Sequence, residues 1–301
     1  MKVAQSFEVD GRTLRMSNLD KPLYPEGFTK GQVLEYYLGI APVMLPHLRG
    51  RAVTLRRWPD GVKAGTFYQK SCPDHRPPWV GTALVKSRDS DESVEHCLLD
   101  ERAALLWAAN LAALEIHVPM ARADDPTRPT AMVFDLDPGA PATLSDCLRI
   151  GLRLRDVLRH LGLDCLPKTS GSKGLHVYVP LNTKVTFEQT KSFAHAIATL
   201  LSEQEPKLVT ANMSKAQRSG KVFIDWSQND VHKTTVCAYS LRATEQPRVS
   251  TPVTWREVQA ALKNKSGKAL SFSPTDVLKR VAKRGDLFEP LLKQRQVLPT
   301  L

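Results

Sequence analysis

A short apolar run at residues 131–134 leads into Asp135 and Asp137, which are separated by one leucine, and a Pro-Gly pair follows directly. The apolar run and the Pro-Gly stop predict a buried strand that ends here. In a strand, residues i and i+2 point to the same face, roughly 6–7 Å apart. Two carboxylates held this way repel each other unless a cation lies between them. The sequence therefore predicts a divalent metal such as Mg²⁺ or Mn²⁺, because both ions take oxygen ligands.

A third acid has a matching setting, since Asp225 follows the apolar run 222–224 and precedes Trp226. Three aspartates carried by strands indicate a metal centre suited to phosphate chemistry. Cations surround the third acid in the sequence, and their charge would neutralise a triphosphate; the alternative interpretation is a solvated basic rim. These cations are Lys215, Arg218, Lys221, Lys233 and Arg242.

A second cluster, TSGSKGLH, spans residues 169–176 and precedes another apolar run. Its glycines would let backbone N–H groups approach an anion, its hydroxyls would donate hydrogen bonds, and Lys173 would supply a positive charge. The segment is not a Walker loop, because the spacing differs and a strand follows. A Gly/Ser turn is common by itself, but beside the three acids this one favours a phosphate site.

The chain has 301 residues, with 42 Lys and Arg against 31 Asp and Glu, and its formal net charge is +11. Such a surplus favours a polyanionic partner, although a generally basic surface gives the same number. No apolar stretch reaches the ~18 residues of a membrane span, and the N-terminus has no secretory signal. The five cysteines form no CxxC pair and suit a reducing cytoplasm.

The pattern of apolar residues predicts a single domain of two lobes, with an N-terminal lobe at about 1–121 and a catalytic lobe at about 130–301. In the first lobe we expect a helix from Thr29 to about Leu48, a helix capped by Asp100, and a polar connection at 122–129. The strands expected there are 7–16, 52–58, 66–69, 81–86, 94–98 and 115–118.

In the second lobe, strands alternate with helices, which predicts an α/β (α+β) fold with helices packed on a sheet. The elements expected there are strands 131–137, 174–180, 221–226 and 233–241 and helices 143–161 and 187–204. A helical cap follows from about 254. Its basic helix at 279–284 is interpreted as a solvated surface rather than a DNA contact.

Three further features have ordinary interpretations beside functional ones. His117 near a strand end is typical of a hydrogen-bonded structural residue. The aromatic and basic group near Arg56, Phe67 and Tyr68 suits base stacking, but also a half-buried sheet. Cys72 and His75 resemble half of a zinc site; the only other pair, His96 and Cys97, has poor spacing, so zinc is disfavoured.

Taken together, these motifs resemble the polymerase/primase domain of bacterial ATP-dependent DNA ligase D, a branch of the archaeo-eukaryotic primases. The resemblance runs through nearly the whole chain in order, and seven motifs in register are specific. The motifs are NLDKPLYP (18–25), RRWPDG (56–61), LEIHVP (114–119), VFDLDPG (133–139), TSGSKGLH (169–176), VFIDWSQN (222–229) and YSLR (239–242). A primase-type two-lobed sheet fold with an RRM-like catalytic lobe is implied.

The resemblance also implies roles for single residues. Asp135, Asp137 and Asp225 would be the catalytic metal ligands. Lys21 and Lys30 would hold the 5′-phosphate across a gap. The residues implied to hold the incoming nucleotide are His117, Ser170, Ser172, Lys173, His176, Arg218, Gln228 and Arg242. Phe67 and Tyr68 would stack on the template; the ring is kept at the second position, and Tyr adds a hydroxyl.

The implied activity is template-dependent nucleotide addition to 3′ ends at DNA gaps and double-strand breaks during non-homologous end joining. Ribonucleotides would be preferred over deoxynucleotides, and two Mn²⁺ (or Mg²⁺) ions would be the cofactors. The implied partners are DNA ends, gapped duplex with a 5′-phosphate, Ku, and the ligase and phosphoesterase domains of the same system, in the bacterial cytoplasm at the nucleoid.

The chain departs from a usual multidomain ligase D in one respect, because it carries no KxDG adenylation motif. We therefore expect an excised domain or a stand-alone homologue that cannot seal nicks. Two alternatives stay open from the residues themselves. One is a phosphatase of the haloacid dehalogenase type, which also uses a strand-end DxD, although a Gly-Thr or Gly-Val usually follows it there. The other is a DNA-end bridging module that needs no metal.

Overall fold

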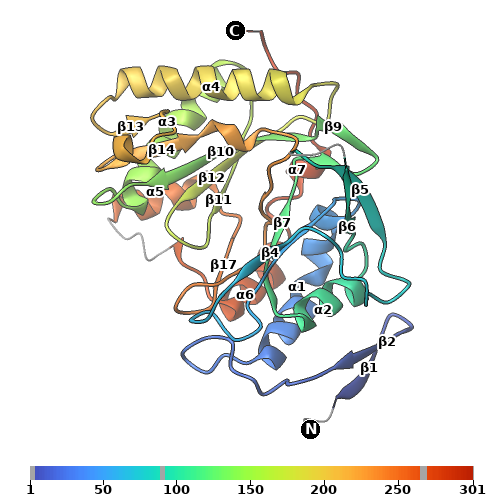
Figure 1. The fold of residues 1–301 in the computed structure, drawn as a ribbon. Coiled ribbons are helices and arrows are strands. Elements are labelled where there is room, and N and C mark those ends of the chain that lie inside the picture. The colour runs from blue at the N-terminus through green and yellow to red at the C-terminus, as the bar shows by residue number, and fades with distance from the viewer. Residues whose placement is uncertain (1–3, 89–91, 265–269, 301) are drawn as a thin grey trace. The chain divides into compact units, whose positions relative to one another are not determined.

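The computed structural model describes residues 4–88, 92–264 and 270–300. The chain, traced by colour in Figure 1, divides into two compact units, each assembled from three segments. Unit 1 comprises the residues up to Pro119, Thr234–Val249 and Ser273–Gly285. Unit 2 comprises Met120–Lys233, Ser250–Phe272 and the residues from Asp286 onward. From the sequence we expected 234–249 and 273–285 in the catalytic lobe, whereas the structure puts both segments in unit 1.

Unit 1 begins with a hairpin of β1 (Gln5–Val9) and β2 (Arg12–Met16). The sequence pattern predicted a single strand over this stretch. Asp10 and Gly11 between the strands have φ values of 50° and 74°, and this left-handed pair makes the tight turn that splits it.

The long helix α1 (Lys30–Leu48) begins as predicted. The Thr29 side chain accepts a hydrogen bond from the Gln32 N–H, and the Gln32 side chain accepts one from the Thr29 N–H. This reciprocal capping satisfies two N–H groups that a helix start leaves unpaired. Helix α2 (Arg102–Asn110) is capped at Glu101 rather than Asp100, because the Asp100 carboxylate accepts from the Gly50 N–H instead.

A four-stranded antiparallel sheet lies at the centre of unit 1, in the order β15-β7-β3-β4. Its strands are β15 (Thr235–Val236), β7 (Ala113–Val118), β3 (Thr54–Arg57) and β4 (Phe67–Gln69). Two smaller pairs and a helix complete the unit: β5 (Thr82–Lys86) with β6 (Ser93–Cys97), β16 (Leu241–Arg242) with β17 (Arg248–Val249), and α6 (Pro274–Arg284).

Unit 2 is built on a five-stranded sheet in the order β11-β12-β10-β14-β13. Among these strands, β13 and β14 run parallel, and the other neighbours are antiparallel. The strands are β11 (Leu166–Thr169), β12 (Leu175–Pro180), β10 (Ala131–Pro138), β14 (Val222–Asp225) and β13 (Val209–Thr210). The predicted polar connection is a small hairpin of β8 (Ala121–Arg122) and β9 (Asp125–Pro129).

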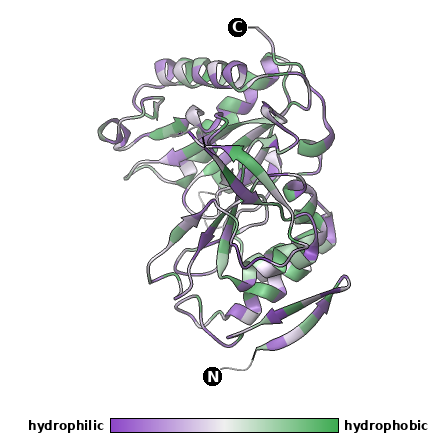
Figure 2. Ribbon diagram, turned by 45° about the vertical axis from the view of Figure 1, so that its right-hand side comes forward, coloured by the Kyte–Doolittle hydropathy of each residue, from purple (hydrophilic) through white to green (hydrophobic). Residues whose placement is uncertain are grey.

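Helices α3 (Leu144–His160) and α4 (Phe187–Gln204) cover one face of this sheet. Phe134 and Leu136 of β10 point into the resulting core and are fully buried, as are Leu154 of α3 and Ala194 of α4. Hydrophilic and hydrophobic residues alternate along α4 in Figure 2, as expected for a helix with one face on a core. The remaining helices are α5 (Trp255–Lys263) and α7 (Pro290–Lys293), with the 3-10 turns η1 (Lys215–Arg218) and η2 (Trp226–Gln228).

The predicted fold class is therefore confirmed: helices and mixed sheets form an α/β molecule. The predicted strand at 233–241 is instead two short strands, β15 and β16, and the strand β11 was not predicted. In the described residues, no helix combines the length and apolar character that crossing a bilayer requires.

The cysteines differ from expectation. Cys72 and Cys97 are joined in a disulfide, and Cys147, Cys165 and Cys237 are buried without one. A disulfide sulfur is not a thiolate ligand, so Cys72 contributes to no zinc site.

Candidate functional site: an acidic sheet face and a buried glutamate cluster

The register of the unit 2 sheet places the three predicted acids on one face. Asp135 of the central strand β10 lies directly opposite Asp225 of β14. Directly opposite residues of antiparallel strands share a face, with Cβ atoms ~4.5–5.5 Å apart. Asp137, two residues further along β10, shares that face as well. The structure thus gathers on one sheet face acids that are 90 positions apart in the chain.

On its other side, Asp135 lies opposite His176 of β12. The His176 Nε2 atom is 3.2 Å from the Asp135 Oδ1 atom, and the histidine is only 4% exposed. From the sequence we assigned His176 to the nucleotide pocket. Its position beside Asp135 is that of a residue that orients a carboxylate.

The third acid is held by neutral donors. The Asp225 Oδ1 atom accepts hydrogen bonds from the Ser227 N–H (3.0 Å) and Ser227 Oγ (2.6 Å). The Asp225 Oδ2 atom accepts one from Gln228 Nε2 at 2.9 Å. Gln228, predicted to contact the nucleotide, therefore orients a predicted metal ligand here.

The acidic face is chemically suited to hard divalent cations. Its donors are carboxylate oxygens, which Mg²⁺ and Mn²⁺ prefer. Burial, and then the negative charges of Asp137 and Asp135, raise the pKa of the Cys147 thiol behind the sheet. Asp137 is exposed, so the face is open to solvent at this point. Within residues 4–88, 92–264 and 270–300, however, no three His, Cys, Asp or Glu side chains are arranged to hold a metal ion.

Two glycines in the predicted motifs allow close packing around the acids. A Cβ atom on Gly139 would lie 1.9 Å from the Arg218 carbonyl oxygen, and one on Gly174 would lie 2.3 Å from the Leu136 carbonyl oxygen. Either distance is far below van der Waals contact, so a side chain would push the neighbouring backbone away. The glycine after the two acids and the last glycine of TSGSKG therefore have a structural reason that does not involve phosphate.

The TSGSKG segment is the turn between β11 and β12, and a buried serine organises it. Ser170 Oγ accepts hydrogen bonds from the N–H groups of Ser172 (3.2 Å) and Gly174 (3.0 Å). These two N–H groups serve the turn, so they are not the anion donors that we expected from the sequence. The side chains of Ser172 and Lys173 are exposed at the tip.

Arg218 ends η1 and packs against the acidic face of the sheet. Its guanidinium carbon lies 3.7 Å from the centre of the Phe223 ring, and Phe223 pairs directly with Asp137 across the strands. The Arg218 Nη2 atom donates to the Met213 carbonyl oxygen at 2.7 Å. The structure thus brings this predicted phosphate ligand to the neighbourhood of Asp137.

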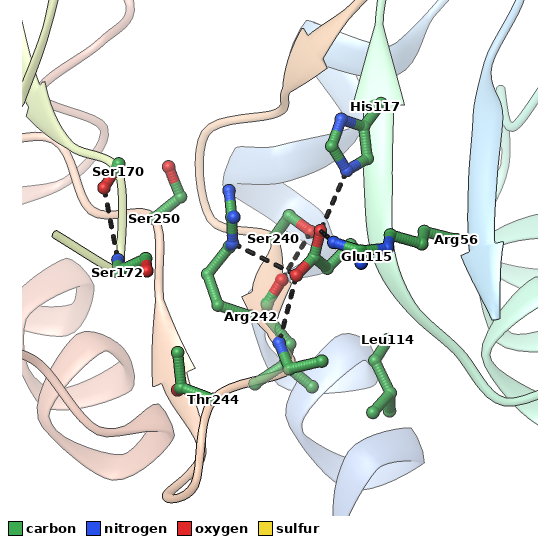
Figure 3. A network of polar contacts seen from close by, with 12 residues as sticks. Arg56, Leu114, Glu115, His117, Ser170, Ser172, Ser240, Arg242, Thr244 and Ser250 are labelled. Carbon is green, nitrogen blue, oxygen red and sulfur yellow. Dashed lines mark hydrogen bonds and ion pairs between the residues drawn. The ribbon is translucent and has the colours of Figure 1, made fainter. Parts of the chain in front are cut away.

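The other predicted nucleotide residues, His117 and Arg242, belong to unit 1. Both contact Glu115 of β7, shown in Figure 3. His117 Nε2 lies 3.0 Å from Glu115 Oε2, and Arg242 Nε lies 3.2 Å from Glu115 Oε1. Arg56 Nη1 approaches the same carboxylate at 3.5 Å, and the Ala243 N–H donates to it at 3.1 Å. We call Glu115, His117, Arg242 and Arg56 the glutamate cluster.

Burial shapes the charges of the glutamate cluster. Burial alone would raise the pKa of Glu115, but the hydrogen bond from His117 and the charge of Arg242 outweigh it and lower the pKa to about 2. Burial lowers the pKa of His117, and Glu115 opposes that shift only in part. Glu115 is therefore an anion at neutral pH, although its side chain is only 2% exposed.

Three tyrosine hydroxyls brace the backbone in and next to β7 and β16, the strands that carry Glu115, His117 and Arg242. Tyr37 donates to the Leu114 carbonyl oxygen beside Glu115 at 2.7 Å. Tyr36 donates to the Tyr239 carbonyl oxygen, and Tyr24 donates to the Arg242 carbonyl oxygen at 3.0 Å. The backbone of both strands is thus fixed from α1 and the turn before it.

Phe67 and Tyr68 are neighbours on β4, so they point to opposite faces of the sheet. The Arg57 guanidinium carbon lies over the Phe67 ring, 5.2 Å from the centre of that ring. Tyr68 instead contacts Arg56 (5.0 Å) and the His117 ring (5.8 Å). The structure separates the predicted stacking pair, because only Tyr68 joins the glutamate cluster.

Lys21 and Lys30 lie side by side, since the Lys30 N–H donates to the Lys21 carbonyl oxygen. Lys30 is 6% exposed, and its Nζ donates to the Ser17 carbonyl oxygen at 2.7 Å. Burial, followed by the charges of Lys21 and Arg57, lowers the pKa of Lys30 to about 8. Lys21 pairs with the exposed Asp60 at 2.8 Å. Two lysines this close together are suited to an anion.

Sequence reasoning left Glu115 without a role, although the motif LEIHVP contained it. The available signal was a single acid within a segment whose other residues indicate a buried strand. A buried carboxylate needs charged partners, so an acid at such a position marks a candidate site. The identity of those partners was not visible, since Arg56 and Arg242 lie 59 and 127 positions away from it, and only the fold brings them together.

Comparisons with known proteins agree with this architecture. The model of the LigD primase-polymerase domain family matches residues 29–288. The chain is 41% identical over 281 residues to the multifunctional non-homologous end joining protein LigD of Mycolicibacterium smegmatis, covering 92% of this chain and 36% of that protein. It is 33% identical over 288 residues to the bifunctional LigD of Bacillus subtilis, covering 95% and 45%. The chain thus spans less than half of either relative.

A solved structure is also similar: the polymerase domain from Mycobacterium tuberculosis ligase D in complex with DNA. It matches with a TM-score of 0.86 at 39% identity, over 94% of this chain and 99% of that one. The family model covers most of the chain, and the relatives and the solved structure match nearly its whole length, so the chain belongs to the LigD primase-polymerase domain family.

Proposed function

We propose that the chain is a template-dependent nucleotidyltransferase that adds nucleotides, preferentially ribonucleotides, to 3′ ends at gaps and breaks in DNA during non-homologous end joining. Family membership supports the class of activity. One structural observation carries the catalytic part: the register that pairs Asp135 with Asp225 and puts Asp137 on the same face. Carboxylate oxygens are the donors that a two-metal phosphoryl transfer uses, so this face supports the proposal.

Asp135, Asp137 and Asp225 would hold two Mn²⁺ or Mg²⁺ ions. When bound, such ions lower the pKa of an attacking hydroxyl and offset charge on the phosphates. The residues of the chain do the positioning. His176 orients Asp135, while Ser227 and Gln228 hold the two oxygens of Asp225 in fixed directions. A carboxylate fixed in this way loses little entropy when it becomes a ligand.

The cations would bind the triphosphate of the incoming nucleotide. We assign this role to Lys173, Arg218 and Arg242, and His117, whose pKa is lowered, would add a hydrogen bond. Arginine is suited to this task, because its planar guanidinium can donate two parallel hydrogen bonds to phosphate oxygens.

Lys21 and Lys30 would bind the 5′-phosphate on the far side of a gap, and Phe67 and Tyr68 would contact the template or the nucleotide through their rings. The DNA in the similar ligase D structure supports DNA as the partner. We include Ku and the ligase and phosphoesterase domains as partners in the proposal, because the relatives bear the names of multifunctional end-joining proteins.

A primer-extension assay on a gapped duplex tests the proposal. With Mn²⁺ and ribonucleotides, the protein should fill the gap, and Asp137→Ala should abolish extension while DNA binding in a gel shift stays within about two-fold, since the exposed acid supports metal binding rather than the fold. Asp156→Asn, an exposed acid on α3, is the control. Substantial extension by Asp137→Ala would refute the two-metal role.

The same assay separates the alternatives. A bridging module would bind ends without metal or nucleotide and never extend them. A phosphatase of the haloacid dehalogenase type would form a trapped aspartyl-phosphate at Asp135, and the family match speaks against it.

A further inference from the structure

Glu115 has an unexpected charge for its surroundings. It is an anion among residues that the proposed function assigns to a triphosphate, and a triphosphate would be repelled by it. The carboxylate cannot be a nucleotide ligand itself, because it is 2% exposed and both of its oxygens are in contact with protein groups. Its four contacts therefore point to a role that acts through its partners.

Glu115 contacts Arg242 and His117 through only one nitrogen each, and their other nitrogens point away from the carboxylate. Glu115 engages Arg242 through Nε, and the Nη end of the guanidinium extends away from the carboxylate in Figure 3. Glu115 engages His117 through Nε2, so the Nδ1 edge of the ring faces away from it. One carboxylate thus fixes the rotation of two long or hinged side chains that come from different strands, β7 and β16.

Charge gives a second reason for the arrangement. Arg56, His117 and Arg242 converge within 3.5 Å of one carboxylate, and without it two arginines would repel each other in a poorly hydrated place. Glu115 keeps these three side chains gathered when no phosphate is present. Side chains already gathered lose less conformational entropy when a ligand arrives.

We propose that Glu115 is the positioning residue of the nucleotide site, holding His117 and Arg242 ready for the triphosphate of the incoming nucleotide. The inference rests on the proposed function and deepens it. Removing the carboxylate charge should weaken recognition of the phosphate chain more than it slows the chemical step, because the metal ligands of unit 2 are untouched.

The test is steady-state gap filling with UTP, Mn²⁺ and the full chain. We expect Glu115→Gln to raise the KM for UTP about ten-fold while kcat falls less than about three-fold, the pattern of a lost binding contribution. The KM for DNA should not change. Glu115→Asp keeps the charge but shortens the reach, so it should show the same KM effect at about a third of the size. If Glu115→Gln does not fold, Glu115→Asp carries the test.

Two readouts exclude a merely structural effect. Binding of UTP with Mn²⁺ should weaken in Glu115→Gln, whereas binding of UMP should not, because UMP lacks the β and γ phosphates. In a mutant cycle, Glu115→Gln should add less than about two-fold to the KM of the double variant His117→Ala/Arg242→Ala, since Glu115 acts through those two residues. The matched control is Glu95→Gln, which removes an ion pair with Arg76 elsewhere in unit 1.

The outcomes separate the two proposals. If the wild-type chain does not extend DNA, the proposed function fails. If it extends DNA and a folded Glu115→Gln has an unchanged or lower KM for UTP, or weakens UMP and UTP equally, Glu115 is not a positioning residue.

Discussion

The acidic face of unit 2 and the glutamate cluster of unit 1 accommodate carboxylate charge in opposite ways. Glu115 has Arg56, His117 and Arg242 within 3.5 Å, so the protein balances its carboxylate itself. Asp225, by contrast, is held by the neutral donors Ser227 and Gln228, and it lies beside Asp135 across the strands. The difference teaches how to distinguish the two kinds of acid. We expect a carboxylate surrounded by arginines to be structural or positioning, and we expect carboxylates gathered side by side to bind external cations.

The largest expected effect comes from the acidic face. Asp225→Asn keeps the shape of the side chain but removes its charge, so extension should fall on the order of 10³-fold through loss of metal binding. The rate of gap filling at saturating Mn²⁺ measures it. If Asp225→Asn and Glu115→Gln lose activity equally, and both through kcat, the comparison between the two regions is wrong.

The second-largest expected effect is a loss of folding stability when the close packing around the acids is disturbed. Gly174→Ala places a Cβ atom against the Leu136 carbonyl oxygen, and overpacking of this kind costs about 1–3 kcal/mol of folding free energy. Thermal or urea unfolding would measure the loss. Gly65→Ala is the control, since a Cβ atom there would meet nothing within 4 Å in the described part of the chain, and its φ is not positive. Equal stability of the two variants would contradict the close approach of the strands.

Because Phe67 and Tyr68 lie on opposite faces of the sheet, their alanine variants should impair different binding steps. Tyr68→Ala should raise the KM for nucleotide about three- to ten-fold, because it removes packing on His117 and Arg56 worth about 1 kcal/mol. Phe67 lies on the other face, so Phe67→Ala should instead weaken DNA binding. The two KM values, for UTP and for gapped DNA, measure the effects. Identical profiles for both variants would show that the rings act as one platform.

The smallest effect concerns pH. The Lys30 pKa is lowered to about 8, so its charge is present below pH 8 and is lost as the pH rises through that value. The preference for a gap with a 5′-phosphate should therefore decline about two- to three-fold between pH 7 and 9, since a neutral amine no longer attracts the phosphate. Lys21→Ala should reduce the preference at every pH. A flat profile in the wild-type chain would remove Lys30 from the phosphate site.

Much of the fold could be predicted from local sequence. Helix α4 was predicted with its observed ends, 187–204, because apolar residues recur at helical spacing. The structure adds that Thr186 and Gln189 form a capping box at its start. The hairpins were harder. The segment 122–129 has the composition of a polar linker, yet it forms β8 and β9, because backbone pairing across a hairpin does not require apolar side chains.

By itself, the sequence determined the local chemistry: which acids end strands, where glycines interrupt them, and that Asp135 and Asp137 share a face. These properties follow from dihedral preference and from the two-residue period of a strand. Only the tertiary structure decided the long-range neighbours. It paired Asp225 with Asp135, placed His176 beside an acid, and surrounded Glu115 with Arg56 and Arg242. The physical reason is that strand register and the burial of charge depend on packing between segments far apart in the chain, and no local pattern records it.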